Sequence, residues 1–214
     1  IVVVAVMPCT SKKFEAQRPE MEVNGLRAVD ISLTTRELAR MIHDARIDFV
    51  RLPDEECFDE LVAQSTGAAP IFGATGGVME AALRTAADVL EKRSVENVEY
   101  HEVRGLAGIK EATFTLGGKE LKVAVASSTG AAKELIQRIK AGDASYAFVE
   151  VMACPGGCVN GGGQPIVSAY KRMDLDPREK RAAGLYAEDE SKVIRKSHEN
   201  PDIKKLYEEF LGKP

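Results

Sequence analysis

Two cysteines stand in a stretch that has almost nothing to pack as core. Cys154 and Cys158 lie four residues apart within Val151–Pro165, which also holds five glycines and two prolines. Glycine lets the backbone approach a ligand closely and adopt positive φ, and thiolates bind soft metals and iron–sulfur clusters. The alternative is a pair of inert thiols beside a glycine-rich turn. We interpret the stretch as a candidate ligand site.

A third cysteine follows the short apolar run at the start of the chain. Ile1–Val6 is rich in β-branched residues, which is typical of a strand buried on both faces. A proline ends this run, and Thr10 or Ser11 can then cap a short helix. Cys9 is therefore expected at the exit of a strand, where ligands bind in open α/β folds. The ammonium group of Lys12 is expected about one helical turn beyond it.

Both stretches resemble signature motifs of the iron-only (di-iron) hydrogenases. Met7-Pro8-Cys9-x-x-Lys12-x-x-Glu15 resembles the second motif of that family. Glu150-x-Met152-x-Cys154-x-x-x-Cys158-x-x-Gly-Gly-Gly-Gln164-Pro165 resembles the third, and Ile71–Leu83 is similar to the family as well. The resemblance runs over nearly the whole chain, which is identified on this basis as the C-terminal part of a catalytic domain.

The resemblance implies an H-cluster, a 4Fe–4S cubane bridged by a cysteine thiolate to a di-iron subsite with CO, CN and dithiolate ligands. Cys9, Cys154 and Cys158 match three cubane ligands, and Cys158 matches the bridging one. Because a cubane takes four thiolates, the resemblance places the fourth ligand before Ile1, together with the cysteine that passes protons to the di-iron unit.

The resemblance also assigns roles to residues without thiols. Lys12 matches the residue that holds a cyanide ligand, since an ammonium donor offsets anionic charge in a dry pocket; outside the motif it would be a solvated lysine. Met7 and Met152 match soft side chains beside the di-iron unit, although in an arbitrary protein both would be core. Phe72 and Gly73 would line the surrounding cavity.

The implied activity is the reversible reduction of protons to H2, with electrons from ferredoxin or NAD(P)-linked subunits and with the upstream part of the same domain as a partner. A second hypothesis is a non-catalytic iron–sulfur assembly relative, and a third is a sensory relative. Retention of Lys12, Met7, Met152 and the Gly161–Pro165 stretch argues against the assembly hypothesis.

The expected fold class is α/β, with a parallel or mixed sheet flanked by helices. This sheet would form part of a two-lobed hydrogenase domain over residues 1–168, and a helical, small-subunit-like tail would wrap that domain over 169–214. Strands are predicted at 98–103, 112–116, 121–127 and 146–151, with a hairpin turn at Gly117-Gly118. Helices are predicted after Gly77, from Ser127 to about Lys140, from Asp176 and from Asn200.

Smaller features carry structural rather than chemical predictions. Residues 18–29 are expected to form a surface loop, residues 32–37 resemble a capping box, and Phe49-Val50 is expected to be extended. A helix is predicted to open at Pro53, with acids in its first turn and Cys57 packed as a small hydrophobe. His43 is assigned a place at a helix C-terminus and His198 a place on the surface.

The charge, hydrophobicity and cysteine content of the chain limit the kinds of partner and location that it can have. The net charge of −4 and the lack of a basic patch exclude a typical nucleic-acid binder. No apolar run reaches the roughly 20 residues that a membrane span needs. The cysteine usage favours metal ligation in a reducing compartment, and the cytoplasm is expected. Since the chain opens on a strand without an initiator Met, it is interpreted as a fragment.

Overall fold

The computed structural model describes residues 1–53, 59 and 63–212. The chain divides into two compact units, which we describe separately. The first unit comprises residues 1–56 and 158–177, and the second comprises residues 57–157 and 178–214. The acidic first turn and Cys57 of the helix predicted from Pro53 lie outside the described residues.

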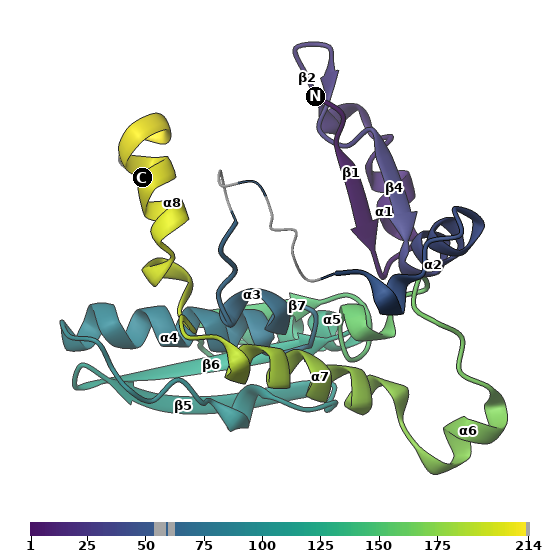
Figure 1. Cartoon of the computed structure of the whole chain (residues 1–214). Helices are drawn as coiled ribbons and strands as arrows, with labels where there is room; N and C mark the ends of the chain where they lie inside the picture. The colour runs from purple at the N-terminus through teal and green to yellow at the C-terminus, as the bar shows by residue number, and fades with distance from the viewer. Residues whose placement is uncertain (54–58, 60–62, 213–214) are drawn as a thin grey trace. The chain divides into compact units, whose positions relative to one another are not determined.

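A parallel strand pair organises the first unit. In Figure 1, β1 (Val4–Met7) and β4 (Ile31–Thr34) lie side by side, with Val4 opposite Ile31. The other elements are α1 (Ser11–Glu15), η1 (Pro19–Met21), β2 (Glu22–Val23), β3 (Leu26–Arg27), α2 (Thr35–Asp44), η2 (Phe49–Arg51), η5 (Cys158–Asn160) and α6 (Ala169–Asp174). Helices α1 and α2 both contact β4.

Three predictions for this unit need correction. The first strand exists but is not buried, because its sheet has two strands among the described residues and Val4 and Val6 remain 49% and 45% exposed. Residues 18–29 lie mostly at the surface, as predicted, but they are not all loop: residues 22–27 form a small hairpin, β2–β3, whose turn places Asn24 and Gly25 at positive φ. Phe49 and Val50 belong to a 3₁₀ turn rather than an extended segment.

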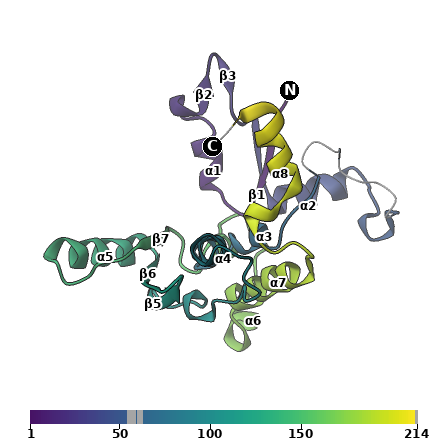
Figure 2. The ribbon, with the colours of Figure 1, turned by 90° about the vertical axis from the view of Figure 1, so that its left-hand side faces the viewer.

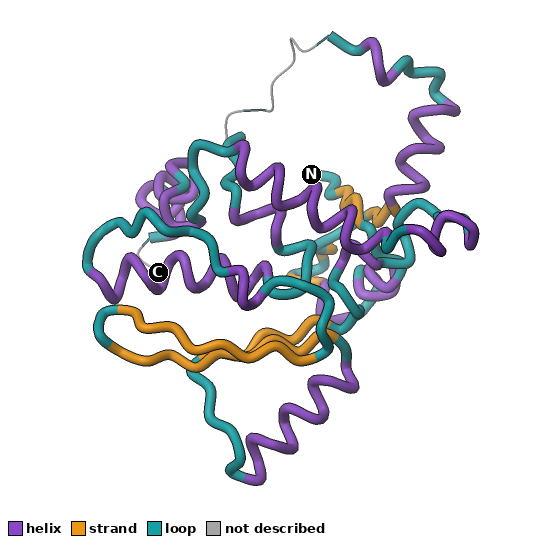
Figure 3. The backbone as a smooth tube through the Cα atoms, turned by 90° about the horizontal axis from the view of Figure 1, so that it is seen from below, coloured by secondary structure: helices purple, strands orange, loops and turns teal. Residues whose placement is uncertain are grey.

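A mixed three-stranded sheet organises the second unit. Strand β6 (Lys119–Ser127) pairs antiparallel with β5 (Ile109–Leu116) and parallel with β7 (Phe148–Met152). Figure 3 shows the three strands running together, with the β5–β6 hairpin at one end. The helical elements are α3 (Ala68–Ile71), α4 (Gly77–Glu91), η4 (His101–Val103), α5 (Thr129–Ala141), α7 (Pro177–Ser191), η6 (Ser197–Glu199), α8 (Pro201–Leu206) and η7 (Tyr207–Leu211).

The pleat of β6 divides the core between its two faces. Val123 and Val125 pack with the apolar face of α4, whereas Ala124 and Ala126 pack with α5. Because successive strand residues point to opposite faces, the two helices cover opposite sides of the sheet, as Figure 2 shows. The predicted α/β fold class, with a mixed sheet flanked by helices, is thereby confirmed.

Most elements of the second unit agree with the sequence predictions. The hairpin turn at Gly117-Gly118, with both residues at positive φ, and the starts of α4, α5, α7 and α8 are confirmed. The strand predicted at 98–103 is wrong, since the structure has the 3₁₀ turn η4 there. None of the described helices is long and apolar enough to cross a bilayer.

Buried charges attach the C-terminal segment to α4. Both side chains of the Arg84–Asp189 pair are fully buried, and Arg84 Nη2 lies 2.8 Å from Asp189 Oδ2. His198, which was predicted to be a surface residue, also has partners: its Nε2 lies 2.9 Å from Asp88 Oδ2 and its Nδ1 lies 3.0 Å from Thr85 Oγ1. The segment after α7 is therefore held by specific polar contacts.

Candidate metal centre

In the first unit the turn that carries Cys9 is packed against the glycine loop that follows Cys158. The N–H of Gly163 donates to the carbonyl of Pro8 across 2.9 Å, and the N–H of Gly161 donates to Cys158 O across 2.9 Å. A Cβ on Gly161 would lie 2.0 Å from Pro8 O. No side chain fits between these two backbone segments. The loop can approach Pro8 this closely because residue 161 is glycine.

Strand β4 and helix α2 support the same loop. A Cβ on Gly163 would lie 2.9 Å from Thr34 Cβ and 3.0 Å from Cys9 N. Arg36 Nη1 donates to Gln164 O across 2.6 Å. Thr34 and Glu37 form the predicted capping box at the start of α2, which fixes the backbone at this point. The first unit thus joins the second-motif turn to the third-motif glycines.

Lys12 lies on α1, as predicted. Its Nζ forms two short contacts with Glu15, 2.7 Å to Oε1 and 2.6 Å to Oε2, and both side chains remain partly exposed. Lys12 and Glu15, the two charged residues of the second motif, therefore form an i,i+3 ion pair on α1. Any anionic ligand of Lys12 would share the ammonium with this carboxylate.

In the second unit the turn after β7 carries Cys154 and packs against the segment before α4. Thr75 N donates to Gly156 O across 3.1 Å, and Gly157 N donates to Cys154 O across 2.9 Å. Ser127 Oγ accepts from Gly156 N at 2.9 Å. Gly157 has φ of +95°, and a Cβ there would lie 2.7 Å from Gly73 O and 2.8 Å from Thr75 N. Glycine is required here by both its φ and the lack of space.

The glutamate of the third motif caps a helix. Glu150 is 5% exposed, and its two carboxylate oxygens accept from Gly76 N and Met79 N, each at 2.7 Å. The first N–H groups of a helix lack intrahelical partners and carry partial positive charge, so a buried carboxylate is stabilised there. Glu150 therefore fixes the start of α4 against β7.

A buried lysine beside this cap was missed by the sequence analysis. Lys110 of β5 is 8% exposed, and its Nζ donates to Gly105 O at 2.8 Å and Thr75 O at 3.2 Å. Burial lowers its pKa to about 8, against an opposing effect of the Glu150 carboxylate. The sequence pattern could have indicated this burial, because Lys110 is two residues before Ala112 and therefore lies on the same face of the strand, the face that packs toward α4.

The remaining predicted residues occupy the ends of elements. Met7 and Met152 are the half-buried last residues of β1 and β7. Phe72 is 45% exposed, and Gly73 backs onto α7, where a Cβ would lie 2.7 Å from Leu185 Cδ1. Met7 and Met152 each lie two residues before a cysteine. Gly73 contacts the Cys154 turn at Gly157, and Phe72 precedes Gly73 in the chain.

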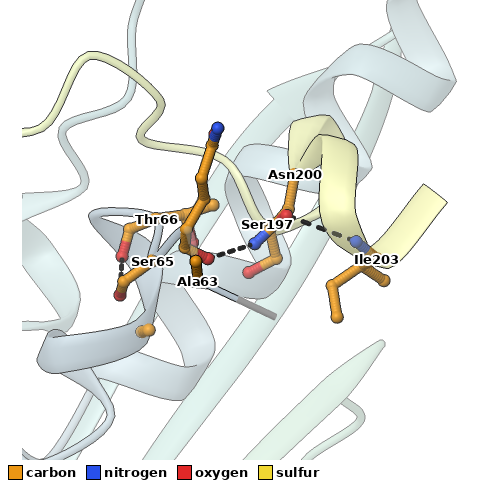
Figure 4. Close-up of a pocket in the computed structure, with 8 residues that line it drawn as sticks. Ala63, Ser65, Thr66, Ser197, Asn200 and Ile203 are labelled. Atoms are coloured by element: carbon orange, nitrogen blue, oxygen red, sulfur yellow. Dashed lines mark hydrogen bonds between the residues drawn. The ribbon is translucent and has the colours of Figure 1, made fainter. Parts of the chain in front are cut away.

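Two cavities of the second unit are large enough to hold small molecules. A cavity of about 210 Å³ borders Thr75, Gly156 and Tyr186, beside the Cys154 turn. A larger one of about 500 Å³ lies between Thr66 and Asn200 (Figure 4), where Asn200 Nδ2 donates to Gln64 O at 3.0 Å. None of the residues predicted for the metal centre borders the larger cavity.

The donor set fits an iron–sulfur group. Cys9 and Cys158 are half-buried thiols at two segments that pack together in the first unit, and Cys154 is an exposed thiol in the turn after β7 in the second. Thiolates are the ligands that iron–sulfur clusters prefer. At Gly157, Gly161 and Gly163 the backbone lies so close to neighbouring backbone that a Cβ would not fit.

Comparison with known proteins identifies the family. The model for the iron only hydrogenase large subunit, C-terminal domain, matches residues 1–162. The chain belongs to the iron-only hydrogenase family. A second model, for the iron hydrogenase small subunit, matches residues 175–214.

Individual relatives agree with this membership. The chain is 53% identical over 214 residues to the NADP-reducing hydrogenase subunit HndD of Solidesulfovibrio fructosivorans, covering all of this chain and 36% of the relative. It is 48% identical over 187 residues to the periplasmic [Fe] hydrogenase large subunit of Nitratidesulfovibrio vulgaris, covering 87% of this chain and 43% of the relative. The structure of a variant of the [FeFe]-hydrogenase HydA1 from Chlamydomonas reinhardtii matches with a TM-score of 0.76 and 38% identity, covering 100% of this chain and 59% of that one.

Iron–sulfur assembly proteins also match, at lower identity. The cytosolic iron–sulfur assembly component 3 of Rattus norvegicus is 34% identical over 217 residues, covering 97% of this chain and 43% of the relative. The chain thus spans 36% and 43% of the hydrogenase subunits and 43% of the assembly component.

Proposed function

We propose that this iron-only hydrogenase family member is part of an enzyme that catalyses 2 H⁺ + 2 e⁻ ⇌ H2 at an H-cluster. Cys9, Cys154 and Cys158 would hold the cubane, and Cys158 would be the thiolate shared with the di-iron subsite. The observation that carries the proposal is the close packing of the Gly161–Gly163 loop on the Pro8-Cys9 turn. This packing supports the proposal because it joins two cysteine motifs far apart in the sequence.

When bound, the H-cluster supplies the electron transfer and the hydrogen chemistry, and the protein supplies ligation, charge and exclusion of water. Lys12 would donate a hydrogen bond to the anionic ligands of the di-iron unit. Met7 and Met152 would pack beside the di-iron unit without adding charge, and Phe72 and Gly73 would line the cavity around it. The fourth cubane thiolate and the proton-passing cysteine come from the upstream part of the same domain.

The wider assignment follows from the relatives. The 53% identity to an NADP-reducing hydrogenase subunit supports electron exchange with NAD(P)-linked subunits. Ferredoxin is the alternative electron carrier in this proposal. We propose a catalytic domain over residues 1–168 and a small-subunit-like helical tail over 169–214 that wraps it. A cytoplasmic location is also proposed, and cell fractionation tests it against the location of the periplasmic relative.

The test is an infrared spectrum of the full-length protein, purified without oxygen after expression with hydrogenase maturation proteins. Bands in the carbonyl and cyanide stretching region are the expected result. In the Cys158→Ser variant these bands and H2 turnover should both be lost. A blank spectrum despite bound iron and sulfide would reject the hydrogenase assignment, as would turnover at wild-type rates in Cys158→Ser.

The second candidate is an iron–sulfur assembly protein, or a sensory relative, that makes no H2. The 34% identity to an assembly component is the observation that favours it. An assembly protein would show the optical and magnetic signals of a cubane without carbonyl or cyanide bands. A sensory relative would show the bands with little turnover, so the same preparation separates the three cases.

A further inference from the structure

Lys110 is a buried cation without a buried carboxylate partner. In the described part of the chain no carboxylate lies within ion-pair distance of its Nζ, which instead donates to Gly105 O and Thr75 O. The Glu150 carboxylate acts on Lys110 through its charge and raises the pKa of the lysine. Its oxygens accept hydrogen bonds from Gly76 N and Met79 N. A buried charge of this kind is costly unless another group compensates it.

The ammonium is connected to the cysteine turn through a single residue. Thr75 accepts from Lys110 at its carbonyl and donates from its N–H to Gly156 O across 3.1 Å. Gly156 lies between Cys154 and Cys158, and a Cβ on its neighbour Gly157 would lie 2.8 Å from Thr75 N. Lys110 and the cysteine turn are therefore both hydrogen-bonded to the backbone of Thr75.

A cluster with thiolate ligands would supply the missing negative charge. Four thiolates and a cubane form an anion, and reduction adds one further negative charge. A nearby buried ammonium stabilises the reduced form more than the oxidised form, because the attraction grows with the charge of the cluster. Net charge and hydrogen bonding around the cluster are among the properties that set its potential.

We propose that Lys110 positions the cysteine turn and raises the reduction potential of the cubane that Cys154 helps to hold. The inference rests on the proposed function. The step concerned is a one-electron reduction in which the cubane gains an electron from an added reductant such as dithionite.

The experiment uses full-length protein expressed without di-iron maturation, so that the readout is the cubane alone and not H2 turnover. Potentiometric titration followed by electron paramagnetic resonance gives the midpoint potential. Lys110→Met should shift the midpoint to a more negative value, whereas Lys110→Arg should stay near wild type because it keeps the charge. Lys119→Met, which removes an exposed lysine from β6, is the matched control and should not shift it.

Iron and sulfide content separates positioning from charge. Lower cubane content in Lys110→Met, restored in Lys110→Arg, is the result expected of a positioning residue. Normal content with an unchanged midpoint in Lys110→Met would overturn the proposal. If wild-type protein binds no iron and sulfide, the proposed function itself has failed, and the role of Lys110 falls with it.

A second measurement covers the case in which Lys110→Met does not fold. Burial lowers the pKa of Lys110 and a bound anionic cubane would raise it, so raising the pH from 7 to 10 removes part of the charge of Lys110 in wild-type protein. The midpoint should then become more negative, with a smaller change in Lys110→Arg. A wild-type midpoint that does not change over this range would reject the charge role.

Discussion

The N–H of Gly163 donates a hydrogen bond to Pro8 O across 2.9 Å, which brings the third-motif loop onto the turn that carries Cys9. The same carbonyl limits the loop at a second point, where a Cβ on Gly161 would lie 2.0 Å away. Backbone contact of this kind cannot be relieved by a change of side-chain rotamer. The arrangement of the Cys9 and Cys158 segments therefore depends on glycine at positions 161 and 163.

Replacing Gly161 should separate the two segments. We expect Gly161→Ala to destabilise the first unit by about 3 kcal/mol and to lower cluster content, because its Cβ meets backbone. Gly162→Ala is the matched control, since its Cβ would meet the Thr10 side chain at 3.0 Å, which can move. Hydrogen exchange and iron content are the measurements. Equal behaviour of the two variants would contradict the packing described here.

Removing the charge of Glu150 should loosen the start of α4. In Glu150→Gln one of the two N–H groups bonded to the carboxylate would face an amide NH2, so we expect a loss of about 2 kcal/mol. Faster hydrogen exchange at Gly76 and Met79 would report the change. Glu120→Gln, an exposed residue of β6, should leave these amides as in wild type. Unchanged protection in Glu150→Gln would show that the cap is dispensable.

The buried Arg84–Asp189 pair should be costly to break. Burial by itself raises the pKa of Asp189, but hydrogen bonds from Arg84 and Arg195 outweigh it and lower the pKa below its usual value. Arg84 also pairs with the buried Glu80 at 2.9 Å, so Asp189→Asn would leave these buried guanidinium groups with one carboxylate fewer, and we expect roughly 3 kcal/mol of destabilisation. Urea unfolding measures this.

The control for that measurement is a partly exposed ion pair at the C-terminal end of α7. Glu188→Gln removes the partner of Lys192 and should change stability by less than about 0.5 kcal/mol. A cost for Asp189→Asn as small as that would mean that the buried pair adds little to the attachment of α7.

The capping box of α2 should make stability depend on pH. Hydrogen bonds from Lys13 and from Thr34 lower the pKa of Glu37 from 4.5 to about 2. A carboxylate whose folded pKa is depressed stabilises the fold above its unfolded pKa, and this stabilisation is lost as the pH falls from 4.5 through 2. Urea unfolding at several pH values should therefore show that the difference between wild type and Glu37→Gln shrinks in this range. The exposed Glu22→Gln serves as the comparison, and a difference that does not vary with pH would count against the ionised cap.

Lys12 can be separated from its neighbour Lys13. Under the proposed function, Lys12→Asn should impair retention of the di-iron subsite, with weaker carbonyl and cyanide bands per cubane. Lys13→Asn removes an ammonium that bonds to Ser32 O and Glu37 instead, and should retain the bands. Full di-iron loading in Lys12→Asn would remove the role given to that residue.

Local features of this protein could be predicted from the sequence because local forces set them. The capping box of Thr34 and Glu37, the Gly117-Gly118 hairpin and the apolar face of α4 each follow from residues close in sequence. The cysteine motifs likewise identified the family. The hairpin at Asn24-Gly25 was missed although its turn signal is local.

Tertiary structure decided which distant groups meet. The sequence pattern does not place Glu150 at the N-terminus of α4 or Lys110 beneath Thr75, because both contacts join segments far apart in the chain. The exposure of β1 has the same origin: its residues favour a buried strand, but burial requires neighbouring strands, and β4 is its partner in the described structure. Local propensity thus fixed the elements, whereas non-local packing and the burial of charge fixed the surroundings of the cysteine turns.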